Sequence, residues 1–384
     1  MRDSIRLFTI RGIQLRVHLT FPLILIWAML QFGLFTGLGW EGALFGVIVI
    51  LILFGIVVLH ELGHSIAAQN YGIEVEEIVL LPIGGVAMLK RIPEKPMQEF
   101  VIAIAGPAVN FALAAVLLAL DALFGLAGRF ADPVEGLAQM QTLSVASVFN
   151  YVFVANLFLA FFNLIPAFPM DGGRVLRALL ATRLSYPRAT AIAVGIGQAL
   201  AWIIGLWGFL SGAFFVILVA IFIYMGAGQE NQQVQVRHVL RDLTVRHAYS
   251  RRVRVLTPET TLAEAVEHVV TGFQSDFPVC DGQRLQGLLT YKNLIDGLSK
   301  HTPNTPVSAA MTTHIQPLAP DAALVHAQQE MMRQGIDVLP VVEHGEFKGL
   351  LTSRDVGEVY RVASIQPDLL PKLRDTGISI EPQR

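Results

Sequence analysis

Long apolar segments separated by short polar ones make up the first 228 residues of the chain. Six of them have about the 20 mostly apolar residues that a helix needs to cross a bilayer, and they lie at 18–37, 43–68, 98–126, 143–165, 188–207 and 209–227. The first lacks a cleavage site of small residues and is followed at once by the next, so it is not a removable signal peptide. The pattern predicts a polytopic α-helical membrane unit with about six transmembrane helices.

The pattern changes over 245–363, where shorter segments repeat with an offset of 62 residues. Each copy has a proline-containing turn, an amphipathic helix (262–272 or 324–334), two short apolar strands and a closing helix. The clearest match sets Gly287-Leu-Leu-Thr290 against Gly349-Leu-Leu-Thr352. Two such copies predict a soluble α/β pair with pseudo-twofold symmetry and a cleft between them.

Charge follows the same division. Only 26 of the first 237 residues are charged, against 32 of the remaining 147, and no strongly basic surface points to nucleic acid. The single cysteine, Cys280, excludes a disulfide framework or a thiolate metal cluster. We expect the parts to be a membrane unit at 1–228, a linker at 229–244, the two copies at 245–306 and 307–363, and a C-terminal tail at 364–384.

Basic residues predict the orientation in the membrane. Four arginines precede the first apolar segment, at Arg2, Arg6, Arg11 and Arg16. The positive-inside rule therefore places the N-terminus in the cytoplasm. Six crossings then put the connections 69–97 and 166–187 inside, the 127–142 connection outside, and the repeats back in the cytoplasm. We expect a multi-pass protein of the cell membrane.

Three ionisable residues, His60, Glu61 and His64, lie together inside the second apolar segment. Ionisable groups at mid-helix cost about 2.5–3.5 kcal/mol on insertion scales and mark function. A spacing of four residues puts the two histidines about 40° apart on one helix face, one turn from each other. Two imidazoles so placed bind one Zn²⁺, and the intervening glutamate acts on a metal-bound water. If the pentapeptide occurred by chance, three polar side chains would be buried in an apolar segment without any compensating function.

A third ligand must reach the same depth on the cytoplasmic side. The fourth segment ends there in Asn163-Leu-Ile-Pro-Ala-Phe-Pro-Met-Asp171-Gly-Gly, and Asp171 is the only carboxylate between Glu135 and Glu230. The prolines and glycines break the helix, which is tolerated at depth only against protein or a water-filled cavity. Two histidines, one aspartate and a water make a catalytic zinc geometry. The alternative is that Asp171 only caps the next helix.

The blocks at 60–64, 105–110 (Ala-Gly-Pro-Ala-Val-Asn) and 163–173 resemble, in that order, the site-2 protease family of intramembrane zinc metalloproteases. The resemblance covers about residues 10–228 and is closest to prokaryotic members with a C-terminal CBS-domain pair.

The resemblance implies a set of roles for residues of these blocks. It implies His60, His64 and Asp171 as zinc ligands and Glu61 as the catalytic acid/base. It also implies that Asn163 supports the site by steadying the oxyanion, although a hydrogen bond between helices is an open alternative. For Asn110 we expect a packing role.

The predicted reaction is metal-assisted hydrolysis of peptide bonds within or near transmembrane segments of a membrane-protein substrate, as in regulated intramembrane proteolysis. The segment 74–88 is apolar, β-branched and broken by Pro82 and two glycines, so it predicts a hairpin or re-entrant loop near the site. Two roles are open for this segment. It would hold an extended substrate by strand addition, or it would only plug the active-site cavity. We expect Arg174, Arg177 and Arg183 to form an interfacial helix face that fixes topology.

The repeated unit resembles a tandem CBS-domain pair. In that family, a threonine and an aspartate three residues later often contact the phosphate and ribose of an adenine nucleotide such as ATP or AMP. The matching residues are Thr352 and Asp355 in the second copy, and Thr290 in the first, where Asn293 replaces the aspartate. The same residues are good helix N-caps. A sensor of adenylates and a rigid module for homodimerisation are therefore both open.

Two other functions compete with a protease. A CBS-regulated metal or ion transporter would show charged residues along several segments or an inverted repeat, and the sequence has neither. A non-catalytic membrane scaffold would be expected to have lost Glu61 or a ligand, and all of these residues are present.

Overall fold

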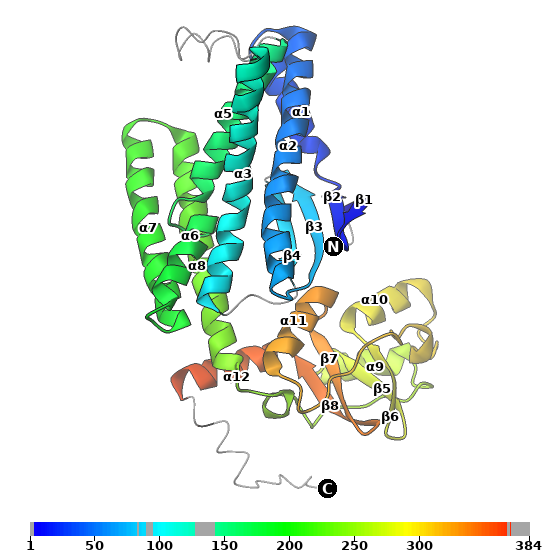
Figure 1. Cartoon of the computed structure of the whole chain (residues 1–384). Coiled ribbons are helices and arrows are strands. Elements are labelled where there is room, and N and C mark those ends of the chain that lie inside the picture. The colour runs from blue at the N-terminus through cyan, green and yellow to red at the C-terminus, as the bar shows by residue number, and fades with distance from the viewer. Residues whose placement is uncertain (1–3, 83, 90–94, 127–142, 367–368, 370–384) are drawn as a thin grey trace. The chain divides into compact units, whose positions relative to one another are not determined.

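The computed structural model describes residues 4–82, 84–89, 95–126, 143–366 and 369 (Figure 1). The chain divides into two compact units, Met1–Gln232 and Gln233–Arg384. The outer connection predicted at 127–142 and most of the predicted tail lie outside the described residues.

Among the described residues, five helices are long and apolar enough to cross a membrane. They are α2 (Gly39–Asn70), α3 (Pro96–Phe124), α5 (Val145–Asn163), α7 (Tyr186–Leu210) and α8 (Phe214–Leu240). Each contains most of one predicted segment. The last helix, α8, continues through most of the segment predicted as a linker.

The first predicted segment forms a shorter helix. It consists of α1 (Pro22–Met29) and a π-helical turn, η1 (Leu30–Leu34), and together they are apolar but too short for the length criterion that the other five satisfy. At 1.5 Å per residue the pair is about 20 Å long, against a hydrocarbon core of about 30 Å. The predicted count of six transmembrane helices is therefore not confirmed, whereas a polytopic helical unit is.

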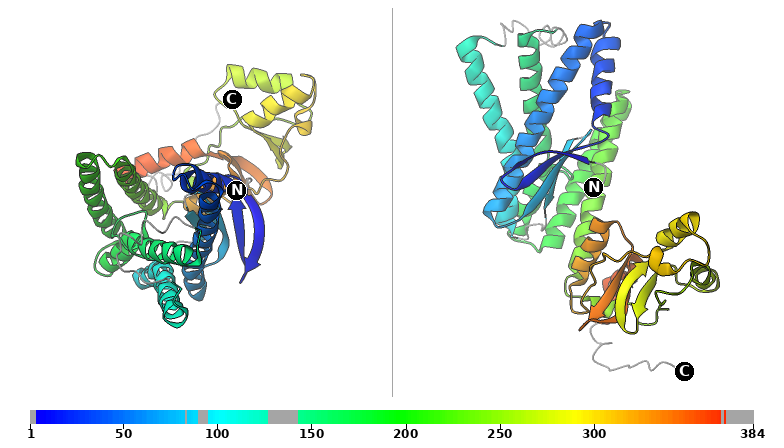
Figure 2. Two further views of the ribbon diagram at one scale, coloured as in Figure 1. Left: turned by 90° about the horizontal axis from the view of Figure 1, so that it is seen from above. Right: turned by 90° about the vertical axis from the view of Figure 1, so that its right-hand side faces the viewer.

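A four-stranded sheet accompanies the helices. Its strands are β1 (Ser4–Ile10), β2 (Ile13–His18), β3 (Val75–Leu81) and β4 (Gly84–Leu89), in that order, with β2 and β3 parallel and the other pairs antiparallel. The sheet lies beside α2 (Figures 1 and 2), and Ile13 and Ile78 share an apolar core with Phe54 and Leu62 of that helix. The hairpin predicted at 74–88 is β3 and β4, but β1 and β2 were not predicted.

The helix break predicted between Asn163 and Asp171 is present. The helix α5 ends at Asn163, and α6 (Asp171–Ala181) begins after seven residues without regular helix or strand. A Cβ on Gly172 would lie 2.3 Å from the carbonyl oxygen of Ile165, and one on Gly173 would lie 2.7 Å from the backbone of Ala167. The two glycines thus let α6 start directly against the irregular segment.

The second unit contains two copies of one motif. The first is α9 (Leu262–Thr271), β5 (Phe277–Asp281), β6 (Arg284–Leu289) and α10 (Tyr291–Lys300), and the second is α11 (Leu324–Gln334), β7 (Val338–Glu343), β8 (Glu346–Thr352) and α12 (Ser353–Ile365). Short 3₁₀ turns, η2 (Val245–His247) and η3 (Val307–Ala309), precede them. The hairpins have the same register, since Phe277 pairs with Leu289 and Leu339 pairs with Leu351. The predicted α/β repeat is confirmed.

Candidate metal centre

Three side chains from two helices converge inside the membrane unit. His60 and His64 lie on α2, and Asp171 is the first residue of α6; all three are buried. The Nε2 atoms of the histidines are 3.1 Å apart, and each lies 3.1–3.2 Å from Oδ2 of Asp171. Two histidines four residues apart and an aspartate at least 107 residues further along the chain thus form a nearly equilateral triangle of ligand atoms.

The other ring nitrogen of each histidine has its own partner. Nδ1 of His64 lies 2.6 Å from the carbonyl oxygen of Ile102, which only accepts, so this nitrogen donates. Nδ1 of His60 lies 2.6 Å from Oδ1 of Asn110. With the protons on Nδ1, both Nε2 atoms carry lone pairs toward the centre of the triangle.

The orientation of the Asn110 amide follows from its neighbours. Nδ2 of Asn156 donates to the backbone carbonyl of Asn110 over 2.9 Å. The carbonyl can only accept, so Oδ1 of Asn156 must face the Nδ2 of Asn110, which donates to it over 2.9 Å. Oδ1 of Asn110 is then the acceptor for His60. The expectation that Asn110 only packs was wrong, because its side chain orients a predicted ligand.

The triangle fits a tetrahedral metal ion. When both imidazoles are neutral with the proton on Nδ1, the two Nε2 atoms and Oδ2 of Asp171 are three acceptors within 3.2 Å of one another, and a cation among them removes their repulsion. Ligand atoms about 2.0–2.1 Å from a tetrahedral Zn²⁺ are about 3.3 Å apart, close to the separations here. Two imidazoles and one carboxylate are the donor set of a catalytic rather than a structural zinc site.

A glycine on α3 makes room for the imidazoles. A Cβ on Gly106 would lie 2.2 Å from Nε2 of His64 and 2.7 Å from Nε2 of His60. On the facing helix α2, a Cβ on Gly63 would lie 2.9 Å from the carbonyl oxygen of Ala105 of α3. Glycines on both helices therefore allow the close approach that small residues give membrane helices.

Glu61 lies on α2 between the two histidines and packs against β4. A Cβ on Gly85 would lie 2.8 Å from Cγ of Glu61, so the strand passes directly beside this side chain. The sheet order makes β4 an edge strand of the sheet formed by the described residues. The glutamate and a free strand edge are thus brought together.

Comparison with known proteins identifies the family. The model of peptidase family M50 matches residues 48–204, and that of the CBS domain matches 245–300 and 307–360. The zinc metalloprotease MJ0392 of Methanocaldococcus jannaschii is 34% identical over 374 residues, which cover 96% of this chain and 99% of that protein. The chain belongs to peptidase family M50, the site-2 proteases.

Two further relatives match most of the chain or part of it. The putative zinc metalloprotease sll0528 of Synechocystis is 30% identical over 93% of this chain and 95% of its own length. The solved structure of the site-2 protease from Methanocaldococcus jannaschii is 42% identical and covers 59% of this chain and 95% of its own, with a TM-score of 0.43.

Family membership confirms the predicted activity, that of an intramembrane zinc metalloendopeptidase with a C-terminal CBS-domain pair. It does not support the transporter or scaffold alternatives.

Two predicted roles in this site-2 protease can be set against the structure. Asp171 is not the cap of α6, because the N-cap is Met170, and its Oδ2 faces both imidazoles. Asn163 is the last residue of α5 and is half-buried at the start of the segment that leads to Asp171. Its role in supporting the site stays a prediction.

One of the three predicted interfacial arginines is buried. Arg174 and Arg183 are exposed, but Arg177 is only 1% exposed and pairs with Glu99 of α3 and Glu230 of α8. The prediction was wrong for Arg177 because no local pattern indicates that two distant carboxylates meet it.

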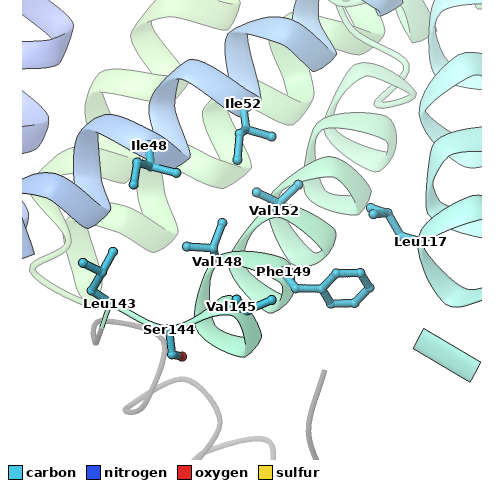
Figure 3. Close-up of a pocket in the computed structure, with 9 residues that line it drawn as sticks. All are labelled: Ile48, Ile52, Leu117, Leu143, Ser144, Val145, Val148, Phe149 and Val152. Carbon is cyan, nitrogen blue, oxygen red and sulfur yellow. The ribbon is translucent and has the colours of Figure 1, made fainter. Parts of the chain in front are cut away.

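A large apolar cavity of about 620 Å³ lies elsewhere in the protease, between α2, α3 and α5 (Figure 3). Its lining residues are Ile48, Ile52, Leu117, Leu143, Ser144, Val145, Val148, Phe149 and Val152. The lining contains no ionisable group, and Ile52 precedes His60 by two helical turns. This cavity therefore offers no catalytic chemistry.

The predicted nucleotide contacts of the CBS pair form helix caps. The backbone N–H and the hydroxyl of Thr352 donate to Oδ2 of Asp355 over 2.8 and 2.7 Å, and the N–H of Asp355 donates back to the hydroxyl over 3.1 Å. Thr290 caps α10 in the first copy and hydrogen-bonds Asn293. The capping alternative is thus observed in both copies.

Proposed function

We propose that His60, His64 and Asp171 hold the catalytic zinc and that Glu61 is the acid/base of peptide hydrolysis. The observation that carries this proposal is the triangle of Nε2 of His60, Nε2 of His64 and Oδ2 of Asp171 at the helix turn that carries Glu61. Bound zinc supplies a Lewis acid and lowers the pKa of a coordinated water toward about 7.

The chain's own residues handle the proton. Glu61 accepts a proton from the attacking water and delivers it to the nitrogen of the departing amine, so that water is added across the peptide C–N bond. Asn110 and the carbonyl of Ile102 keep both Nε2 atoms unprotonated and directed at the centre. The amide N–H of Asn163 stabilises the developing oxyanion.

We propose that the edge of β4 holds the substrate. A transmembrane substrate must unwind before its carbonyls can be attacked, and an unwound segment needs partners for its backbone polar groups in the bilayer. The strand β4 offers such partners by strand addition, and it lies against Glu61 through Gly85. This proximity supports substrate binding over a plug.

The proposed orientation puts the N-terminus, the metal side and the CBS pair in the cytoplasm, with the short helix Pro22–Leu34 as the first of six crossings. His60 follows the start of α2 by 21 residues, or about 32 Å. The centre would then lie near the cytoplasmic end of a hydrocarbon core about 30 Å thick.

For the CBS pair we propose that an adenine nucleotide such as ATP or AMP binds at Thr352 and Asp355, with homodimerisation as the alternative. Support comes from the CBS family match and from the pair at the start of α12, where Oδ1 of Asp355 also lies 3.4 Å from the hydroxyl of Ser250. Calorimetric titration of the full-length protein with ATP and AMP tests this. No heat at millimolar nucleotide would favour the dimerisation module.

Cleavage of a tagged transmembrane substrate in proteoliposomes tests the catalytic proposal. Glu61→Gln should abolish cleavage while zinc stays bound, because only proton transfer is removed. Asp171→Ala should lower the zinc stoichiometry. Cleavage by the Glu61→Gln variant would overturn the mechanism, and full zinc content in Asp171→Ala would remove that residue from the ligand set.

A further inference from the structure

Arg177 is the largest fully buried side chain of the described residues, although it carries a charge. It lies on α6 six residues after Asp171, which is about 9 Å along the helix and about 120° around it. Arg177 therefore shares a helix with a proposed metal ligand but points away from the metal centre.

Its guanidinium group connects four parts of the membrane unit. Nε donates to Oε1 of Glu99 on α3 over 2.8 Å, Nη2 donates to the same oxygen, and Nη1 donates to Glu230 on α8. The group also lies 4.8 Å from the ring centre of Phe168 and 4.9 Å from that of Tyr186 on α7. A planar guanidinium can make all these contacts together, whereas an ammonium group cannot.

The stacked ring of Phe168 belongs to the irregular segment just before α6. That segment is held by single backbone turn hydrogen bonds, such as that from the N–H of Met170 to the carbonyl of Ala167, and not by a helix or strand; Asp171 follows Phe168 by three residues. Arg177 thus holds the chain on both sides of Asp171, through the stacked ring before it and through α6 after it. An arginine that only fixed topology would be exposed, as Arg174 and Arg183 are.

We propose that Arg177 is a positioning residue for Asp171. Its ion pairs with Glu99 and Glu230 fix α6 relative to α3 and α8, so that Oδ2 of Asp171 lies within 3.2 Å of both imidazole nitrogens. The inference rests on the proposed role of Asp171 as a ligand.

The competing explanation is that apolar packing alone holds α6. Leu176 and Leu180 of this helix pack against a small cluster that includes Phe168, Ala193 and Ala227. If this contact were sufficient, removing the guanidinium would leave the position of Asp171 and the affinity for zinc unchanged.

The test uses the full-length protein in detergent, prepared without metal, and measures the zinc Kd by competition with a chelator. Arg177→Met should weaken zinc binding about tenfold or more, as for other residues that orient ligands. Arg177→Lys should restore part of the affinity through one ion pair. Arg183→Met is the matched control and should bind zinc as the wild type does.

Cobalt substitution separates positioning from general loosening. Co²⁺ in the wild-type site should give the intense visible absorption of a tetrahedral ion, and Arg177→Met should change its position or intensity at a temperature well below the lowered melting temperature of the variant. If Arg177→Met fails to fold, Glu230→Ala removes one anchor of the guanidinium and should weaken zinc several-fold.

Two outcomes separate this inference from the proposed function. Wild-type zinc affinity in Arg177→Met or Glu230→Ala, together with loss of zinc in Asp171→Ala, would overturn the positioning role alone. Undiminished zinc in Asp171→Ala would instead overturn the ligand set on which the inference rests.

Discussion

The membrane unit contains two buried polar clusters that solve the same electrostatic problem in different ways. Around Arg177, two carboxylates meet a guanidinium that the chain itself provides. At the metal centre, two imidazole nitrogens and a carboxylate oxygen meet each other, and when the imidazoles are neutral no lysine or arginine of the described residues lies among them. Buried acceptors need a positive partner, so the second cluster depends on a bound ion and the first does not.

The largest effect should come from filling the space reserved for the ion. Gly106→Ala places a methyl group 2.2 Å from Nε2 of His64, so the two imidazoles cannot keep their positions. We expect zinc to be lost and cleavage to fall by at least about 10³-fold. Metal analysis and the proteoliposome assay measure both.

Gly55→Ala on α2 is the control for this substitution, since a Cβ there meets nothing within 4 Å. It should retain zinc and activity. Normal zinc content in Gly106→Ala would contradict the geometry of the centre.

Matched carboxamide substitutions compare the two clusters directly. Asp171→Asn removes the only negative charge of the triangle and should weaken zinc binding by about 100-fold or more, beyond the range for residues that only orient ligands. Glu99→Gln keeps an oxygen for the two N–H groups of Arg177, and Glu230 still balances the charge. This variant should therefore lose much less zinc affinity than Asp171→Asn. Equal losses in both variants would mean that the clusters do not differ as described.

Moving Glu61 without touching the ligands should separate proton transfer from metal binding. A methyl group on Gly85 would press on Cγ of Glu61 at 2.8 Å. We expect Gly85→Ala to lower kcat about 10- to 100-fold at unchanged zinc content, since small misplacements of a catalytic group have effects of this size. Val86→Ala, at an exposed position of the same strand, is the control. Loss of zinc in Gly85→Ala would show that β4 supports the ligands instead.

The smallest of these losses should come from changing Asn156, which supports the hydrogen-bond partner of His60. Asn156 orients the amide of Asn110, which in turn holds Nδ1 of His60. Asn156→Leu leaves that amide without its partner and should weaken zinc binding about tenfold. Chelator competition measures this, and wild-type affinity would show that Asn110 needs no support.

Local sequence patterns predicted the helices and strands of this molecule better than they predicted the contacts between them. The apolar segments predicted the five long helices of the described residues, and the spacing of His60 and His64 predicted their common helix face. Asp171 could be chosen as the candidate third ligand because it is the only carboxylate between Glu135 and Glu230. These features depend on residues close together in the chain, or on a residue type that is rare in that part of the chain.

Contacts between distant segments were beyond such reasoning. Arg177 meets Glu99 and Glu230 across 78 and 53 residues, and no local pattern indicates which charge faces which helix. Asn156 was overlooked because an amide within an apolar helix has a partner only after the helices pack. The strands Ser4–Ile10 and Ile13–His18 were missed because their arginines were interpreted only as a topology signal.

The two histidines differ in how a mutation can disturb them. Nδ1 of His64 donates to a main-chain oxygen, that of Ile102, which is present whatever side chain stands at that position. Nδ1 of His60 donates to a side-chain amide, which a single codon change at Asn110 removes. The orientation of His60 is therefore more easily disturbed by mutation than that of His64, and an intact His-Glu-x-x-His motif does not by itself show that both ligands are held in place.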